Sequence, residues 1–146
     1  MTMNCALKYI AVLLLSQVTL PPAAAGSLKD PTRQSLDLCL GDPKNGSTGD
    51  QTACETNALA SYDKRMNVAY SKLLKELPVQ AGQDLRVAQR SWIAYRDMEG
   101  RARGSLFAIT QGSMYAPMQA DAETDLTRDR ALLLESYLRV LDIDGR

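Results

Sequence analysis

Residues 52–77 decide the fold, and they read TACETNALASYDKRMNVAYSKLLKEL. Apolar side chains recur through this stretch at intervals of three and four residues, which places them on one face of an α-helix. The residues of this stripe are Leu59, Tyr62, Met66, Ala69, Tyr70, Leu73 and Leu77. The cations of the same stretch, among them Lys64 and Arg65, fall off the stripe. Pro78 and Gly82 follow it and should end the helix.

The same periodicity predicts three more helices. A short one covers Pro31–Leu40, since proline is tolerated in a first turn. A second long helix covers Gln83–Arg103, with its stripe on Leu85, Ala88, Trp92 and Tyr95. A third covers Asp121–Leu141 and opens with acidic residues, which a helix N-terminus favours. Its apolar face consists of Leu126, Leu133, Leu134, Tyr137, Leu138 and Leu141.

No stretch shows the alternation typical of a β-strand. The sequence therefore predicts an all-α fold, a small bundle of three main helices plus a short N-terminal helix. Two connections stand out. Gly41–Asp50 is rich in turn-forming residues, and Gly104–Ala120 is long for a helical bundle, where connections of two to eight residues are usual.

The first 25 residues resemble a secretory signal peptide. Lys8 precedes the apolar run Tyr9–Leu20, and Ala23–Ala25 supplies the small residues that a signal peptidase accepts. The apolar run is too short for the roughly 20 residues that span a bilayer, so we expect no stable membrane insertion after cleavage. The mature domain is predicted to be residues 26–146, located in the periplasm or secreted.

Removal of residues 1–25 would leave two of the three cysteines, Cys39 and Cys54. An even pair in an oxidising compartment predicts a disulfide, which would stabilise the fold by roughly 3 kcal/mol. The alternative is a reactive thiol pair, although redox motifs typically use the much tighter Cys-x-x-Cys spacing.

Composition excludes several classes of function. The chain has 17 Lys and Arg, 17 Asp and Glu, and no His. The balanced charge argues against nucleic-acid binding. The absence of His removes the commonest general base and zinc ligand, and no Gly-rich phosphate loop is present. We expect neither catalytic residues nor a cofactor or metal, and predict that the chain is not an enzyme.

Three charged residues interrupt the apolar stripes: Asp63, Arg96 and Arg130. Asn67 and Gln89 lie near the same faces. A buried charge must be paired, so we expect Asp63 to meet Arg96 or Arg130 in a polar network that fixes helix register. A binding or catalytic cluster, or exposure at the stripe edge, are the alternatives.

Residues 89–97, which read QRSWIAYRD, resemble the signature of the LprI-like lysozyme-inhibitor family of exported bacterial proteins. Similar segments surround it, and the resemblance covers about Leu36 to Leu138. They are the helix carrying Asp63, Met66-Asn67 and Tyr70-Ser71-Lys72-Leu73, then Leu85-Arg86, Gly112-Ser113 and Leu126-Thr127-Arg128-Asp129-Arg130.

The chain departs from this family at its usual second cysteine pair. Gly100 occupies the first of the two positions, and the second falls around Ala122–Glu123. A staple between the second and the last long helix is therefore missing. We expect the Gly104–Ala120 connection to be looser than in the family's usual form.

The resemblance implies a protein that binds and occludes a peptidoglycan-cleaving lysozyme in the cell envelope. One candidate contact element is the loop with Ser113, Met114, Tyr115 and Met118, since Met and Tyr are enriched at interface cores. Their side chains could instead pack beneath the loop. The other candidate is the disulfide-closed loop with Asp42 and Lys44, which could also be a solvated turn.

Other functions remain open at this point. The chain could be an immunity protein that neutralises a secreted antibacterial toxin, or an envelope structural or assembly factor that inhibits nothing. An enzyme would need activity that is lost when Asp63 or Asp97 is replaced.

Overall fold

The computed structural model describes residues 30–143 and 145, and this part of the chain is all-α, as predicted. The predicted signal peptide, residues 1–25, lies outside the described residues. The elements are α1 (Pro31–Gly41), a 3-10 turn η1 (Pro43–Asn45), α2 (Thr48–Glu76), α3 (Val79–Ala108) and α4 (Tyr115–Ile143). None of the helices described is both long and apolar enough to cross a membrane.

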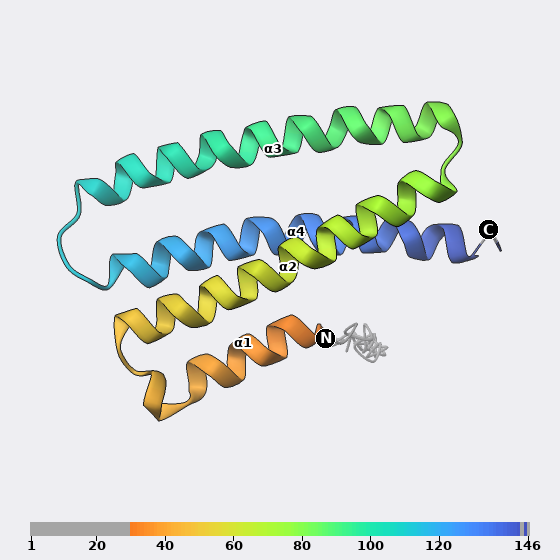
Figure 1. The fold of residues 1–146 in the computed structure, drawn as a ribbon. Helices are drawn as coiled ribbons and strands as arrows, with labels where there is room; N and C mark the ends of the chain where they lie inside the picture. The colour runs from red at the N-terminus through yellow and green to blue at the C-terminus, as the bar shows by residue number, and fades with distance from the viewer. Residues whose placement is uncertain (1–29, 144, 146) are drawn as a thin grey trace, which may run out of the picture.

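Figure 1 shows α2 and α4 side by side and running in the same direction. They run the same way because α3, which follows α2 in the chain, returns to the end where α2 began before α4 starts. The short helix α1 lies along α2 and runs the opposite way. The connections therefore alternate between the two ends of the bundle. The turn between α1 and α2 and the turn between α3 and α4 lie at one end, and the turn between α2 and α3 lies at the other.

The core lies between α2 and α4. From α2 it buries Tyr62, Met66, Ala69 and Leu73, which confirms four of the seven residues of the stripe predicted for residues 52–77. From α4 it buries Thr124, Thr127, Ala131 and Leu134. The predicted face of the last helix was wrong in part, because Leu133 and Tyr137 are exposed. Small side chains let the two helices approach closely, and Thr124 Oγ1 donates to the Glu55 carbonyl at 3.1 Å.

The predicted loop Gly104–Ala120 is wrong, because both flanking helices extend into it. Helix α3 begins at Val79 rather than Gln83 and continues to Ala108, and α4 begins at Tyr115, so only residues 109–114 connect them. Gly100 and Gly104 in the second half of α3 each cost about 1 kcal/mol of helix stability, which the surrounding helix-forming residues offset. Gly112 adopts a φ of 120° and turns the chain, and Pro117 fits the first turn of α4, where its missing N–H has no partner to lose.

Helix α3 is attached to the rest of the bundle mainly through its first half. Its buried residues are Gly82, Leu85 and Gln89. Of the predicted stripe, Leu85 is buried and Trp92 packs against the core, whereas Ala88 and Tyr95 are exposed. At Ala88 the predicted stripe is wrong, because the neighbouring Gln89 faces the core and buries its side-chain amide instead.

Helix α1 is fixed to the bundle at both of its ends. At its C-terminal end the predicted disulfide between Cys39 and Cys54 is present, with a Cα–Cα distance of 5.8 Å. At its N-terminal end Asp30 caps the helix by accepting from the amides of Thr32 and Arg33. The Asp30 carboxylate also accepts from the Tyr62 hydroxyl at 2.8 Å, so α1 and α2 are held together at two points.

Candidate protein-binding site

The two segments that the sequence offered for partner contact lie far apart in the chain but at the same end of the bundle (Figure 1). Helices α1 and α3 end there, and α2 and α4 begin there. Because α2 and α4 run parallel, the first turns of both helices face the same opening. This end of the molecule is therefore where a single partner could touch both segments.

A pocket of about 490 Å³ opens between these first turns. Thr48, Gln51 and Glu55 line it from α2, at the spacing of one helical face. The remaining lining residues come from α1, from the connection between α3 and α4, and from the start of α4: Leu40, Met114, Pro117, Met118 and Asp121. We call this hollow the loop-end pocket.

Glu55 is the buried member of the loop-end pocket. Its side chain is only 4% exposed, and its Oε2 atom accepts no hydrogen bond. Burial raises the pKa of this carboxyl above its usual range, and the nearby charges of Asp121 and Asp125 raise it further. Arg33 and the neighbouring Thr124 hydroxyl lower the pKa of Glu55, but both effects are smaller than that of burial.

The rim of the pocket is apolar and exposed. Met114 and Met118 are 58% and 48% exposed, and Leu40 beside them is 37% exposed. Methionine adapts its shape to an irregular surface, and exposed apolar groups surrounded by polar ones are typical of interaction sites. The pocket thus combines flexible apolar walls with a buried carboxylate oxygen, Oε2 of Glu55, that has no hydrogen-bond partner.

The predicted contact residues of the connection between α3 and α4 divide into two pairs. Met114 and Met118 line the loop-end pocket. Ser113 and Tyr115 do not: Ser113 uses its carbonyl to accept from the Ala116 amide at 3.2 Å, and the Tyr115 ring packs on Phe107 with 6.1 Å between ring centroids. Tyr115 therefore supports the turn.

Asp42 and Lys44, the candidates from the disulfide-closed loop, are exposed but lie outside the pocket lining. The Asp42 carboxylate caps the 3-10 turn by accepting from the Lys44 amide at 2.9 Å. Asn45 Nδ2 donates to the Cys39 carbonyl at 2.8 Å. These bonds order the loop, so a partner at this end of the bundle would meet a preformed surface.

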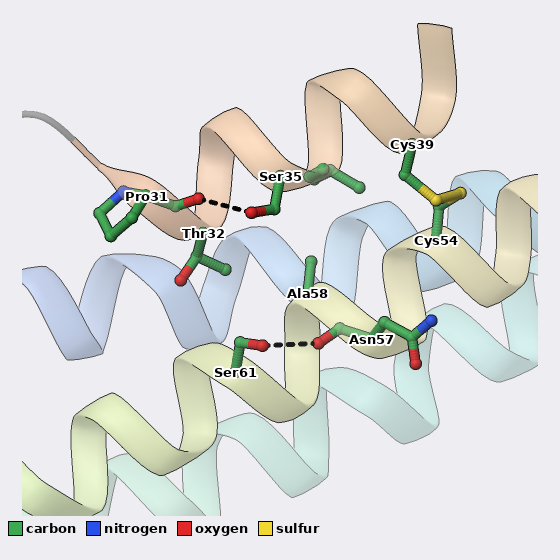
Figure 2. A pocket seen from close by; sticks show the side chains of 9 residues that line it. Pro31, Thr32, Ser35, Cys39, Cys54, Asn57, Ala58 and Ser61 are labelled. Carbon is green, nitrogen blue, oxygen red and sulfur yellow. Dashed lines mark hydrogen bonds between the residues drawn. A yellow bond between two sulfur atoms is a disulfide. The ribbon is translucent and has the colours of Figure 1, made fainter. Parts of the chain in front are cut away.

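A second hollow lies between α1 and α2 and is shown in Figure 2. It measures about 400 Å³ and has the disulfide at one end. The Ser35 hydroxyl in its wall donates to the Pro31 carbonyl at 2.9 Å, and the Ser61 hydroxyl donates to the Asn57 carbonyl at 3.0 Å. Because these groups bond within their own helices, this groove offers a partner less than the loop-end pocket does.

Two of the residues predicted to form a polar network, Gln89 and Arg130, do contact each other, without Asp63. Arg130 Nε donates to Gln89 Oε1 at 2.9 Å, and Gln89 Nε2 donates to the Met66 sulfur at 3.6 Å. The guanidinium of Arg130 also lies 6.0 Å from the centroid of the Trp92 ring. These contacts join α3 to α2 and α4, so the Gln-x-x-Trp spacing serves helix packing.

These residues carry the family resemblance, and the comparison with known proteins agrees with it. The family described as Lysozyme inhibitor LprI matches residues 39–134. The chain belongs to the LprI family. The match includes the disulfide, all of α2 and α3, and the first two-thirds of α4.

Among solved structures, this LprI-family chain is similar to an uncharacterized protein from Burkholderia thailandensis, with 32% identity and a TM-score of 0.70. The similarity covers 75% of this chain and 54% of that one, so the chain spans about half the length of its structural relative. No curated protein matches.

The expected pairing of Asp63 with Arg96 or Arg130 is wrong. Asp63 accepts from Asn67 Nδ2 at 2.9 Å, and Arg96 Nη2 binds Asp97 at 2.8 Å. Asp63 and Arg96 instead line an open cleft of about 540 Å³ between α2, α3 and α4. Water can reach both charges there, so neither needs a buried partner.

The positions of the missing second cysteine pair of this LprI-family chain lie at the same cleft. Gly100 and Glu123, which stand at or beside the two cysteine positions, both line it. Nothing lies within 4 Å of where a Cβ of Gly100 would be. The second half of α3 is thus not tied to α4 at this point, although it remains helical.

Two features of the site were missed. Glu55 lies four residues before Leu59, so it continues the apolar stripe of α2, and an acid in that register was the available signal. Arg65 was placed off the stripe, yet it forms a bidentate ion pair with Glu135 and also binds Asp30. It bridges α1, α2 and α4.

Within residues 30–143, no group of three or more His, Cys, Asp or Glu side chains is placed to hold a metal ion.

Proposed function

We propose that this LprI-family chain is exported and inhibits a peptidoglycan-cleaving lysozyme by binding it at the loop end of the bundle. The observation that carries the proposal is the match of residues 39–134 to the lysozyme-inhibitor family. The chain would act by occlusion, with its loop end covering the substrate cleft of the enzyme, and would perform no chemistry of its own.

The geometry of the loop end supports this mode of action. The disulfide and the capped 3-10 turn order the α1–α2 side of the loop end, and a connection of only six residues between α3 and α4 carries the exposed methionines on the other side. A preformed surface loses less conformational entropy on binding than a flexible one. The rigid end of a helical bundle is therefore suited to fill an enzyme cleft.

Export is supported by the signal-like residues 1–25 and by the bond between Cys39 and Cys54. Disulfides persist in oxidising compartments such as the periplasm and are rare in the cytosol. A lysozyme that attacks peptidoglycan would be met in the same place.

The proposal is tested by a lysis assay with folded residues 26–146. Lysozymes of different classes are titrated with the protein while the turbidity of a peptidoglycan suspension is followed. We expect the inhibition of at least one class to saturate near equimolar protein. A folded protein that inhibits no class at micromolar concentration would contradict the proposal, and lysis by the protein alone would indicate an enzyme.

Two matched variants locate the inhibitory surface in the same assay. Met118→Glu places a charge on the pocket rim and should weaken inhibition at least about tenfold, since interface cores are depleted in charge. Val140→Glu makes the same change at an exposed apolar residue near the other end of α4. It should inhibit like the wild type. Equal loss of inhibition in both variants would argue against the loop end.

A further inference from the structure

The Glu55 carboxylate is in an unfavourable environment in the free protein. Its Oε2 atom is buried and has no hydrogen-bond partner, and an unpartnered buried charge destabilises the fold unless a counter-charge arrives. A second carboxylate, that of Asp121, lines the same pocket from α4. Two acids thus face a hollow in which no cation is among the lining residues.

Arg33, the cation that lowers the pKa of Glu55, does not fill this role. Arg33 on α1 lowers the pKa of Glu55 from a distance, but its guanidinium binds Asp37 at 2.8 Å on the surface of α1. The N-termini of α2 and α4 also favour anions, although this effect fades within the first turn of a helix. Glu55 and Asp121 lie beyond the first turn of their helices.

The walls of the pocket fit a side chain with an apolar stem. Met114, Met118 and Leu40 are exposed at the rim, and the carboxylate of Glu55 is buried behind them. Lysine and arginine side chains bury their methylene stems along apolar surface and carry the charge at the tip. An uncharged apolar side chain would cover Glu55 without pairing it, and an anion would meet two carboxylates.

We infer that the loop-end pocket receives a lysine or arginine side chain of the protein partner, with its stem against Met114 and Met118 and its cation at Glu55 and Asp121. This inference rests on the proposed function only in requiring a protein partner. It identifies the pocket as the specificity element of the inhibitory surface, because partners without a suitably placed cation would leave Glu55 buried and unpaired.

The first test compares the affinity of carboxylate variants for a lysozyme that the wild-type protein inhibits. Glu55→Gln should weaken binding on the order of 30-fold, since removing one member of a buried charge pair costs roughly 2 kcal/mol or more. Asp121→Asn, at an exposed position, should weaken it about threefold and mainly slow association. Glu76→Gln makes the same change at the far end of α2 and should have no effect.

The second test needs no lysozyme. The probes are Nα-acetyl-arginine methylamide and its uncharged analogue Nα-acetyl-norleucine methylamide, each at millimolar concentration, and the readout is the methyl NMR signals of Met114 and Met118. We expect the arginine probe to shift both signals and the norleucine probe to shift them much less. Glu55→Gln should remove the difference between the two probes.

The two tests separate this inference from the proposed function. If the arginine probe binds the pocket but no lysozyme binds the protein, the lysozyme proposal fails and the cation site stands. If a lysozyme is bound equally well by the wild type, Glu55→Gln and Asp121→Asn, the cation site is wrong and the inhibitor proposal stands. Equal shifts with both probes would likewise overturn the cation site and indicate a merely apolar pocket.

Discussion

Replacing Arg65 with methionine should lower the free energy of unfolding by about 3 kcal/mol. Arg65 joins three helices through one guanidinium. Its Nε and Nη2 atoms each lie 2.8 Å from a carboxylate oxygen of Glu135 on α4, and its Nη1 atom binds Asp30 and the Thr32 hydroxyl at the start of α1. The same group lies 5.1 Å from the centroid of the Tyr62 ring.

The magnitude follows from the partners that the substitution leaves behind. Breaking a buried ion pair by removing one member costs roughly 3–5 kcal/mol. The side chain of Arg65 is 22% exposed, so water reaches part of the network, and we take the lower end of that range. Methionine keeps much of the packing of the side-chain stem, so the loss reports mainly the charge and its hydrogen bonds.

Unfolding in urea, followed by far-ultraviolet circular dichroism, measures the effect. The matched control is Arg33→Met, which breaks an exposed pair with Asp37 whose side chains are 47% and 54% exposed. Surface pairs of this kind contribute about 0.5 kcal/mol or less. The slope of the free energy against urea concentration should stay unchanged in both variants, since neither substitution alters the surface exposed on unfolding.

The difference in the free energy of unfolding between the wild type and Arg65→Met should become smaller in acid. Burial raises the pKa of Asp30, but hydrogen bonds from Arg65 and Tyr62 outweigh it and hold that pKa below its usual range. An acid with a lowered native pKa contributes stability that is present above its unfolded pKa of about 3.9 and is lost as the pH falls through the native value. A loss no larger than that of Arg33→Met, or a difference that does not change in acid, would refute this reasoning.

Three other stability predictions use the same unfolding assay. Replacing Cys39 and Cys54 together with serine should cost about 3 kcal/mol, because the bond closes a loop with a sequence separation of 15, and a reductant should have the same effect on the wild type only. Glu55→Gln should stabilise the protein by about 1 kcal/mol at neutral pH. The pKa of Glu55 in the folded wild type is raised, so the carboxyl becomes neutral first in the folded state as the pH falls. The stability gained by Glu55→Gln should therefore vanish as the pH falls through the raised pKa toward the unfolded value of about 4.3. Gly100→Ala and Gly104→Ala should each stabilise α3 by roughly 0.5–1 kcal/mol, since nothing lies within 4 Å of either new Cβ, and a loss instead would contradict the open cleft.

The helical fold and the disulfide could be predicted from the sequence because both depend on strong local signals. Four residues of the stripe predicted for residues 52–77 are buried, and the pairing of Cys39 with Cys54 needed only an even count of cysteines in a chain expected to be exported. Helix ends were less predictable. The predicted helices ended at Arg103 and began at Asp121, yet a glycine inside a helix costs little and a proline in its first turn costs nothing.

The polar contacts could be predicted only in part. The involvement of Gln89 and Arg130 in a register-fixing network was predicted, but their mutual pairing depends on how α3 crosses α4. Asp63 was expected to meet Arg96 or Arg130, whereas Asp63 and Arg96 line the open cleft between α2, α3 and α4. One residue pattern fits both a tight interface and an open one, and the distance between helices decides which forms.

The loop-end pocket shows the same limit. Met114 and Met118 were candidates because of their composition, but only the parallel arrangement of α2 and α4 brings them to Glu55. Glu55 itself falls in the register of the apolar stripe, so an acid at a core position was visible in the sequence. Its lack of a partner depends on residues more than 50 positions away and could not be read from the local pattern.

We propose that this LprI-family chain binds a lysozyme with the loop end of the bundle. Hydrogen exchange of the backbone amides, measured for residues 26–146 alone and with an inhibited lysozyme, tests it most directly. We expect the bound lysozyme to slow amide hydrogen exchange only in residues 40–51 and 110–121. Protection centred on the turn between α2 and α3, or along the outer face of α3, would contradict it.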